Sequence, residues 1–154
     1  MYRTVVILIA LCGSVTGFTE TYLRLVDRMH TGSVCGMDTD SAHRIAITCS
    51  PDKTAKIWDV RTGALLTTFY PPATPGREGR LYACALTPDG SRAAVGGWTG
   101  WSGTGSCCIY LFETRTGKFI RRIDGFPNAI AGLCFSPDRQ HLAVCMLGGG
   151  GVAL

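Results

Sequence analysis

A short run of residues occurs twice in this chain at one spacing. Arg61-Thr62-Gly63 returns as Arg115-Thr116-Gly117, and each copy follows a β-prone run that ends in an aromatic residue and an acid. These pairs are Trp58-Asp59 and Phe112-Glu113, so both elements repeat after 54 residues (58 to 112, 62 to 116). Self-similarity at a fixed period indicates one structural unit that is built more than once. The fold must therefore be an array of similar units.

A second repeated signature is a turn. Leu86-Thr87-Pro88-Asp89-Gly90 returns 49 residues later (88 to 137) as Phe135-Ser136-Pro137-Asp138-Arg139. Proline fixes φ early in such a turn, aspartate bonds back to the chain, and glycine accepts a positive φ. Because Arg139 replaces the glycine, we expect the second of these turns to be more strained.

The composition favours short strands over helices. Of 154 residues, 46% are apolar and 17% are charged, which is typical of globular proteins, and the 20 glycines are about twice the average share. No stretch keeps a helical apolar period for three turns, so the sequence predicts an all-β protein. Two complete four-stranded units and part of a third are expected, with strands over 33–40, 44–49, 54–60, 64–70, 80–87, 92–97, 107–113, 118–123, 129–136 and 141–146; a further strand opens at 152, and an outer strand precedes them at 21–26.

Alternation along these strands predicts which side chains face neighbouring units. The expected core residues are Val34, Met37, Ile57, Leu81, Cys84, Leu86, Val95, Leu111, Ile130, Leu133, Phe135 and Val144. Cys35, Cys134 and Cys145 have small or apolar neighbours like those of Cys84, which suits free cysteines packed as small hydrophobes. Disulfides stay unassigned, because the eight cysteines become seven if an N-terminal leader is removed.

Two segments make the units longer than a minimal four-stranded repeat. One is the Pro- and Gly-rich stretch 71–79, and the other is 98–106, which carries Trp98 and Trp101 among Gly, Ser and Thr. Aromatic side chains on such loops are typical binding anchors, so Trp98 and Trp101 form a candidate partner-binding loop. The alternative is that both rings pack against the sheet, since Trp is usually largely buried.

The first 17 residues differ from the rest. A single positive charge at Arg3 is followed by the apolar run 5–11 and by the small residues Gly13, Ser14 and Gly17. This pattern is typical of a signal peptide over residues 1–17, which favours export, with residues 18–154 as the mature array. The apolar run is too short for a stable membrane span. A cytoplasmic protein with a buried N-terminal strand is the alternative.

The stretch 52–63, DKTAKIWDVRTG, together with the paired Pro-Asp turns and the repeated Thr-Gly, resembles the WD-repeat β-propeller proteins. The likeness runs from residue 21 to residue 154 and is greatest to bacterial members that carry an export signal. The resemblance implies a partial β-propeller of four-stranded antiparallel blades. A propeller closes with about four to eight blades. Either self-association or missing downstream blades would then be needed to close the ring.

Members of this family hold each blade with a buried network of His, Ser or Thr, Asp and Trp. The resemblance places this structural network at His30, Thr48, Asp52 and Trp58, with Ser50 as a second candidate for the hydroxyl. An indole N–H only donates, a hydroxyl donates and accepts, and a carboxylate fixes the histidine tautomer, so every member can be satisfied.

The second unit departs from that pattern. Arg77 stands where the histidine would fall, and Phe112, which cannot donate a hydrogen bond, stands where the tryptophan would fall. We therefore expect the second blade to be held by packing.

Other chemistry is weakly supported. His30, Asp52 and a hydroxyl are also the ingredients of a hydrolytic triad, but no strained Gly-x-Ser-x-Gly turn is present. His141 and Cys145 lie about 13 Å apart if they share a strand, too far to bind one metal ion. The glycines at 148–151 lack the Lys-Ser or Lys-Thr of a phosphate loop. The sequence predicts no catalytic residue, metal ligand or cofactor.

The charge pattern narrows the partners. The formal charge is +4, and the basic residues are scattered apart from Arg121-Arg122, so nucleic acid is not expected. The sequence favours a non-enzymatic scaffold that binds proteins or peptides. The alternative is a docking or sensing module of a larger enzyme, for example a peptidase, whose catalytic domain lies downstream.

Overall fold

Every regular element of the protein is a β-strand within the residues that the structure, a computed structural model, describes: 29–73, 75–100, 105–148 and 152–153. The predicted all-β class is confirmed. The expected strand at 21–26, the leader and Trp101 lie outside the described residues. The strands are β1 (Gly36–Thr39), β2 (Ile45–Cys49), β3 (Ala55–Asp59), β4 (Leu65–Phe69), β5 (Arg80–Leu86), β6 (Arg92–Trp98), β7 (Cys107–Glu113), β8 (Phe119–Phe126), β9 (Ile130–Phe135), β10 (Leu142–Met146) and β11 (Val152–Ala153).

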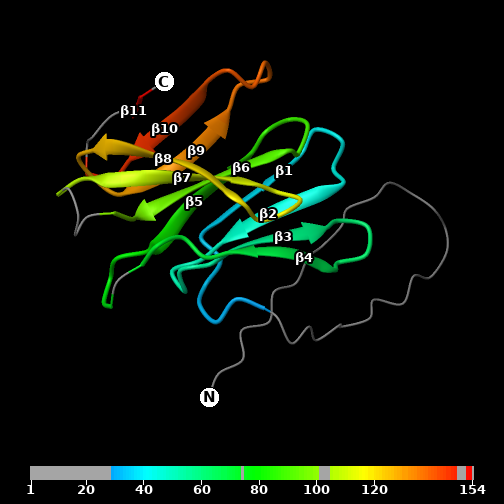
Figure 1. Ribbon diagram of the computed structural model, residues 1–154, viewed down its shortest axis with the longest axis horizontal. Coiled ribbons are helices and arrows are strands. Elements are labelled where there is room, and N and C mark those ends of the chain that lie inside the picture. The colour runs from blue at the N-terminus through cyan, green and yellow to red at the C-terminus, as the bar shows by residue number, and fades with distance from the viewer. Residues whose placement is uncertain (1–28, 74, 101–104, 149–151, 154) are drawn as a thin grey trace.

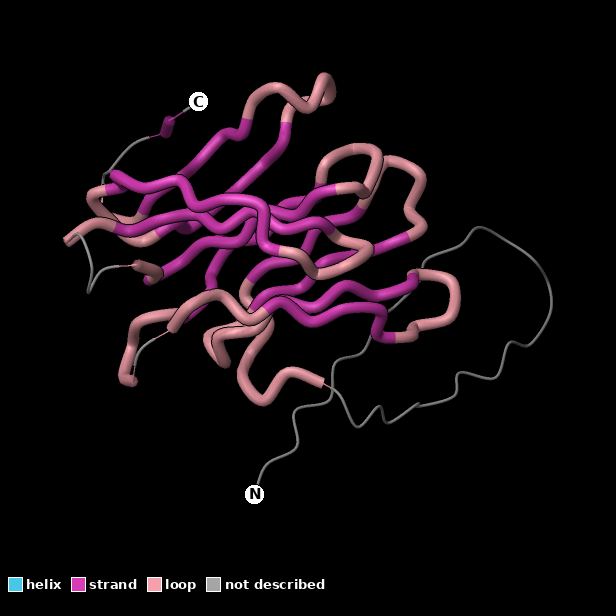
Figure 2. Tube along the Cα trace, in the orientation of Figure 1, coloured by secondary structure: helices cyan, strands magenta, loops and turns pink. Residues whose placement is uncertain are grey.

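These strands form three antiparallel sheets. Their orders are β1-β2-β3-β4, β5-β6-β7-β8 and β11-β10-β9, which we call the first, second and third sheets. The second sheet lies between the other two (Figure 1), and loops join one sheet to the next (Figure 2). Two complete four-stranded blades and part of a third are therefore present, as the sequence predicted.

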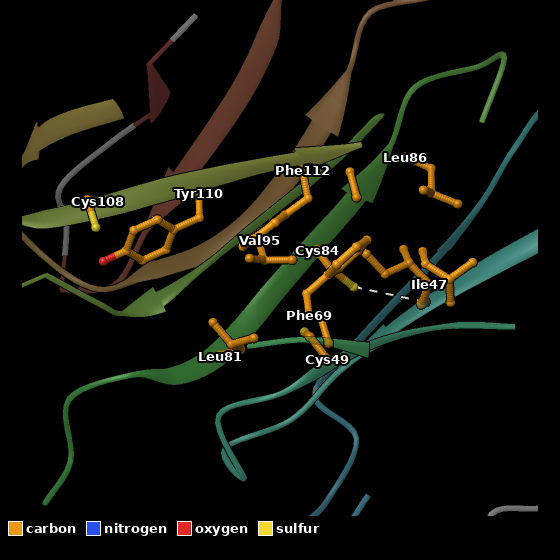
Figure 3. Packing of buried hydrophobic residues seen from close by; sticks show 13 residues of the cluster. Ile47, Cys49, Phe69, Leu81, Cys84, Leu86, Val95, Cys108, Tyr110 and Phe112 are labelled. Carbon is orange, nitrogen blue, oxygen red and sulfur yellow. Dashed lines mark hydrogen bonds between the residues drawn. The ribbon is translucent and has the colours of Figure 1, made fainter. Parts of the chain in front are cut away.

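A hydrophobic cluster joins the first sheet to the second (Figure 3). Phe69 of β4 stacks on Phe112 of β7 with ring centroids 4.7 Å apart, and the edge of Phe119 meets Phe112 at 5.9 Å. Each fully buried aliphatic or aromatic side chain here contributes about 1.5–3 kcal/mol. The cluster consists of Ile47, Cys49, Ala55, Ile57, Phe69, Leu81, Cys84, Leu86, Ala93, Val95, Cys108, Tyr110 and Phe112.

A second cluster joins the second sheet to the third. Its buried members are Ala83, Ala94, Ile109, Leu111, Ile130 and Val144, with half-buried Ile123, Phe126, Leu133, Phe135, Leu142 and Met146 packed against them. The core predictions for Leu111, Ile130 and Val144 are confirmed. Leu133 and Phe135 belong to the cluster but stay half-buried at its margin.

One core prediction is wrong: the Met37 side chain is 61% exposed, and Val34 is only half-buried. β1 pairs with β2 without a bulge, so successive side chains alternate strictly between the two faces. Asp38 takes the face toward the second sheet, where its Oδ2 accepts a hydrogen bond from the Leu86 N–H at 2.8 Å. Met37 consequently points the other way.

Leu81 and Cys84 in β5 are three residues apart, as Val34 and Met37 are, but both were correctly predicted as core residues because β5 is irregular. The β5–β6 register shifts between Leu81 and Ala83, which turns Leu81 and Cys84 onto one face. Both side chains are buried in the first cluster. A β-bulge thus decides which of two similar sequence patterns ends in the core.

The packing predicted for the cysteines holds only for Cys84. Cys35, Cys134 and Cys145 are exposed free thiols. Cys134 and Cys145 alternate with the core-facing residues of β9 and β10, so they lie on the face of the third sheet turned away from the second.

The repeated Pro-Asp turns have one geometry. In 87–90 the Gly90 N–H donates to the Thr87 carbonyl at 2.7 Å, and in 136–139 the Arg139 N–H donates to the Ser136 carbonyl at 2.9 Å. Gly90 has φ +71° and Arg139 has φ +64°, a region that is costly for a side chain with a Cβ. The strain predicted at Arg139 is therefore present in the backbone.

A third copy of this turn escaped the sequence comparison. Residues 50–53 repeat it between β2 and β3, with Lys53 at φ +71° and its N–H 3.1 Å from the Ser50 carbonyl. This turn joins the second and third strands of its sheet, whereas the other two turns join β5 to β6 and β9 to β10. An alignment of the units by strand order therefore does not place it with them.

The turn at Asp89 touches both neighbouring sheets. Its main-chain carbonyl accepts a hydrogen bond from Arg44 Nη2 of the first sheet at 3.1 Å. Its carboxylate Oδ2 accepts one from Arg139 Nη1 beside the third sheet at 2.6 Å. These partners are largely exposed, so each contact contributes little stability by itself. Together they connect all three sheets at one end.

Candidate functional site

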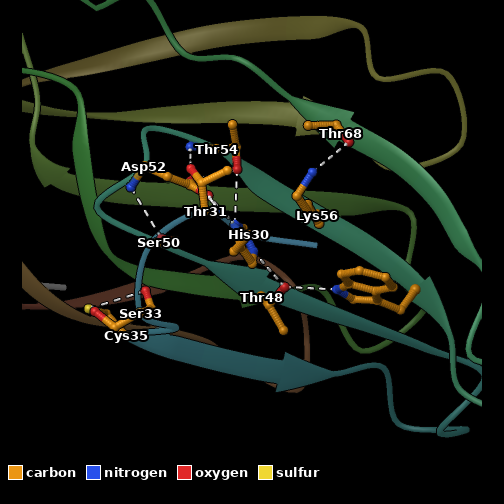
Figure 4. Close-up of polar contacts among 11 residues, drawn as sticks. His30, Thr31, Ser33, Cys35, Thr48, Ser50, Asp52, Thr54, Lys56 and Thr68 are labelled. Carbon is orange, nitrogen blue, oxygen red and sulfur yellow. Dashed lines mark hydrogen bonds and ion pairs between the residues drawn. The ribbon is translucent and has the colours of Figure 1, made fainter. Parts of the chain in front are cut away.

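Four side chains that the sequence singled out meet beside the first sheet (Figure 4). His30 precedes β1, Thr48 lies in β2, Asp52 in the following turn and Trp58 in β3. His30 Nδ1 lies 2.9 Å from Asp52 Oδ2, and His30 Nε2 lies 2.9 Å from Thr48 Oγ1. The Trp58 indole N–H donates to the same hydroxyl at 2.8 Å. The structure thus brings all four together, and Thr48 rather than Ser50 supplies the hydroxyl.

One assignment of protons satisfies every member of this network. The Trp58 N–H can only donate, so Thr48 Oγ1 accepts from it and donates its own proton to His30 Nε2. The opposite ring nitrogen, Nδ1, then carries the hydrogen and donates to Asp52. If His30 gained a second proton, the Thr48 hydroxyl proton would lose its acceptor.

The neutral form of His30 is also favoured by its surroundings. Burial lowers the pKa of His30 below its ordinary value of 6.5, although the Asp52 carboxylate acts in the opposite direction. The positive charge of Lys56 lowers the same pKa further. His30 is therefore a neutral bridge between Asp52 and Thr48 in the folded protein at neutral pH.

Asp52 is held as a carboxylate. Burial alone would raise its pKa, but hydrogen bonds from the Thr54 hydroxyl and the Thr31 N–H, together with His30, lower that pKa below the ordinary 3.8. Thr54 donates to Oδ1 through its N–H at 2.9 Å and its hydroxyl at 2.7 Å, and the Thr31 N–H reaches Oδ2 at 2.9 Å. Asp52 thereby ties the segment before β1 to the β2–β3 turn.

This geometry suits a structural hydrogen-bond network better than a hydrolytic site. A nucleophilic hydroxyl needs a proton acceptor and open access to substrate. His30 and Thr48 are buried, and the Thr48 hydroxyl is already bonded to both His30 and Trp58. Within the described ranges no buried side-chain nitrogen or oxygen lacks a partner.

The second sheet replaces this network with apolar packing. The pairing Ala46↔Trp58 in the first sheet corresponds to Ala93↔Phe112 in the second, and Val95 takes the place of Thr48. Val95 is fully buried, and Phe112 is stacked on the first sheet. The expectation that this blade relies on packing agrees with these contacts.

Asp40 is a buried carboxylate that the sequence did not single out. Its Oδ1 accepts hydrogen bonds from the N–H groups of Arg44 and Ile45 at 2.7 and 3.1 Å, and its Oδ2 pairs with Arg44 Nε at 2.9 Å. Burial opposes ionisation, but these bonds lower the pKa of Asp40. In the sequence, an acid four residues before an arginine looks like a solvent-exposed ion pair, so nothing marked Asp40 as buried. The one signal was that this turn lacks the Pro-Asp signature of the turns at 87–90 and 136–139.

The candidate partner-binding loop starts from a fixed base. Trp98 ends β6 half-buried, and its carbonyl accepts a hydrogen bond from the Gly79 N–H at 2.7 Å. Thr99 is buried and donates its hydroxyl to the Cys108 carbonyl, while Arg122 Nη2 reaches the Gly100 carbonyl at 3.4 Å. Trp101 lies outside the described residues, so the structure does not bring the two tryptophans together.

The described residues hold no group of three or more His, Cys, Asp or Glu side chains placed to share a metal ion. His141 is exposed, with Nδ1 3.8 Å from Asp138 Oδ2, and Cys145 is exposed opposite Gly132. In the same ranges no helix is long and apolar enough to cross a membrane.

Comparison with known proteins agrees with this architecture. Residues 23–59 match the family model described as WD40: WD domain, G-beta repeat. That segment contains the complete His30, Thr48, Asp52 and Trp58 network and ends directly after the Trp58-Asp59 pair.

A solved structure, named Kuenenia stuttgartiensis Hydrazine Synthase, is similar with a TM-score of 0.60 at 15% identity. The match covers 81% of this chain and 33% of that chain, so this chain spans about a third of its length. At such low identity the likeness concerns the fold alone. The repeat match over residues 23–59 and the two complete four-stranded sheets agree with the WD-repeat β-propeller architecture that the sequence resembles.

Proposed function

We propose that this protein is a non-enzymatic scaffold that binds protein or peptide partners through loops at one end of its blades. The match of residues 23–59 to the WD40 repeat carries this proposal. In that repeat, His30 and Thr48 already make hydrogen bonds within the protein. Recognition is then left to surfaces outside the network.

The loop between β6 and β7 is the proposed contact. Binding residues are often carried by loops on a rigid framework, and Thr99 and Arg122 attach this loop to the second sheet at its base. Trp98 is half-buried at the point where the loop leaves β6. With Trp101 it supplies two large aromatic side chains of the kind that dominate binding energy.

Replacement of Trp98 and Trp101 by alanine tests this assignment. We expect the tagged double variant to lose partners that the wild-type protein captures from a lysate of its source, measured by quantitative mass spectrometry. Tyr70→Ala is the matched control, because Tyr70 is an exposed aromatic residue at the end of the first sheet. Unchanged capture by the Trp98→Ala, Trp101→Ala variant would remove the loop from the proposal.

A second candidate function is a docking or sensing module within a larger enzyme such as a peptidase. The similar solved structure bears the name of an enzyme, and the matched region is only 33% of that chain. The coding sequence beyond Leu154 decides between the two. A catalytic domain in the same reading frame supports the module, and a stop codon there excludes it.

We also propose that the protein is exported. The leader-like pattern of residues 1–17 supports this, although those residues lie outside the described ranges. Fused to a phosphatase reporter that is active only after export, residues 1–17 should yield activity. A reporter that stays inactive and uncleaved in the cell would favour the cytoplasmic alternative.

A further inference from the structure

Two buried cysteine side chains from different sheets meet where the first sheet packs on the second (Figure 3). Cys49 ends β2 with none of its surface exposed, and Cys84 lies in β5 with 5% exposed. Both are free thiols within the first cluster. Neither belongs to the His30 network or to the loop at Trp98, so the pair is a separate feature of the molecule.

A glycine makes room for this contact. Gly36 pairs directly with Cys49 across β1 and β2, so both residues take the face of the first sheet that turns toward the second. A Cβ on Gly36 would lie 2.9 Å from Cys49 Sγ and 3.4 Å from the Cys84 nitrogen. Because glycine leaves that point empty, the Cys49 thiol can lie close to the main chain of β5.

The Cys84 thiol reaches back toward the first sheet. Its Sγ donates a weak hydrogen bond to the Ile47 carbonyl of β2 at 4.0 Å, the dashed line in Figure 3. The Cys49 and Cys84 side chains also hydrogen-bond to each other, and this contact, together with burial, raises the pKa of the Cys84 thiol above its ordinary 9.0. Each sulfur thus lies near the other's strand, which is the arrangement that a disulfide requires.

The remaining described cysteines are placed differently. Three of them have exposed side chains, and two are neighbours in β7, where successive side chains point to opposite faces of the sheet. These are Cys35, Cys134 and Cys145, and Cys107 and Cys108 respectively. Cys49 and Cys84 are therefore the described pair in which two buried thiols from different sheets are in contact.

We propose that Cys49 and Cys84 form a disulfide that covalently joins the first and second sheets when the chain folds in the presence of a small-molecule disulfide. One protein thiolate attacks a sulfur of that oxidant, which forms a mixed disulfide and releases one small thiol. The other protein thiolate then attacks the protein-bound sulfur and releases the second small thiol. Two electrons pass from the protein to the oxidant, and the two protons of the cysteines end on the two released thiols.

The surroundings of the pair determine when the bond forms. Only the thiolate attacks a disulfide, and the buried Cys84 thiol is held in its protonated form. The bond therefore forms during folding, before the first cluster closes over the two sulfurs, and the same burial then protects it from reduction. A bridge here concerns how the framework is held together, so it goes beyond the partner binding proposed above and does not depend on it.

Refolding under defined redox conditions tests the pair. The reduced full chain is unfolded in urea, diluted into a mixture of oxidised and reduced glutathione, treated with iodoacetamide to block free thiols, and digested with trypsin. Cys49 lies in the peptide of residues 45–53 and Cys84 in that of residues 81–92, and neither peptide contains another cysteine. We expect mass spectrometry to find these two peptides linked as the main disulfide of the refolded protein.

The same glutathione mixture without dilution of the urea is the control, because the chain is then unfolded and this pair has no reason to predominate. Another pair as the main disulfide of the refolded protein would overturn the proposal. Equal yields of the linked peptides in the two conditions would do so as well, because the folded contact would not be the cause of the bond.

Stability gives an independent readout. We expect the refolded, oxidised protein to unfold at a urea concentration about 1 M or more above that of the reduced protein, because the bridge restricts the unfolded chain between residues 49 and 84. Cys84→Ala should abolish this difference. Cys108→Ala is the matched control, since Cys108 is a fully buried cysteine of the same cluster, and it should keep the difference.

Cys49→Ser replaces Cys84→Ala in this comparison if the alanine variant fails to fold by circular dichroism. A redox-dependent shift that persists without Cys84 or Cys49 would overturn the assignment, and so would equal midpoints for the oxidised and reduced wild-type proteins.

Discussion

At the scale of single residues, the His30 network makes the stability of the first sheet dependent on pH. The His30 pKa is lowered by burial, so the unfolded chain takes up its proton at a higher pH than the folded protein does. The stabilisation is complete above the ordinary value of 6.5 and is lost as pH falls below it toward the folded pKa. Asp52 adds a second loss as pH falls below 3.8, because its folded pKa is also lowered.

We therefore expect the free energy of unfolding to decrease between pH 7 and pH 5 in the wild-type protein. Urea unfolding followed by tryptophan fluorescence measures it, since Trp58 is part of the network. His30→Gln should be less stable at pH 7 and should flatten this pH dependence. His43 and His141 are present in both proteins, so the difference between the curves reports on His30. Parallel curves would show that His30 does not titrate on unfolding.

Single residues differ in how well the sequence predicted their positions. His30, Thr48, Asp52 and Trp58 could be chosen because the family resemblance supplied their spacing, and the structure joins them by hydrogen bonds. Met37 was misplaced because alternation says which residues share a face but not which face the neighbouring sheet covers.

At the scale of strands, the alternating pattern and the turn residues located every described strand to within a few positions. β1 and β8 are the least accurate, with Gly36–Thr39 observed against 33–40 expected and Phe119–Phe126 observed against 118–123 expected. The bulge between Leu81 and Ala83 was not predicted, because it depends on how two strands meet and not on either strand alone.

The bulge in β5 gives a specific prediction at Gly97. A Cβ at this position would lie 2.1 Å from the Arg80 carbonyl oxygen and 2.9 Å from the Tyr82 nitrogen, both backbone atoms that cannot rotate away. We expect Gly97→Ala to lower the free energy of unfolding by about 2 kcal/mol or more. The measurement is a denaturant unfolding curve.

Gly132→Ala is the matched control for that change. Its Cβ would meet only the Cys145 Cβ, at 3.3 Å, in another strand of the protein. Its stability should stay within about 1 kcal/mol of the wild type. If Gly97→Ala and Gly132→Ala lowered the free energy of unfolding by similar amounts, the close approach of β5 and β6 at Gly97 would not exclude a side chain there.

At the scale of the whole molecule, the described residues form two complete blades and part of a third, fewer than the four to eight that close a propeller. The first sheet presents Met37 and Leu66, which are 61% and 53% exposed, and the third sheet presents Cys134 and Cys145. Apolar and edge surfaces of this kind are prone to pairing with other chains.

The chain as given should therefore associate with itself or be poorly soluble. Sedimentation velocity at several concentrations, under reducing conditions to exclude disulfides between exposed cysteines, should show species larger than 16.5 kDa. Met37→Lys should shift the distribution toward smaller species, because it places a charge on the open face of the first sheet. A stable monomer at all concentrations would contradict the open-array interpretation.

The turn at Asp89 has a consequence for how the sheets are joined. Its bonds to Arg44 and Arg139 connect all three sheets along one rim, where β6 begins. Trp98 ends β6 at the opposite rim. There the Leu81 N–H donates a hydrogen bond to the Ser50 carbonyl at 3.3 Å. The first two sheets are therefore joined at both rims, and the loop at Trp98 emerges from a base that is attached to its neighbour.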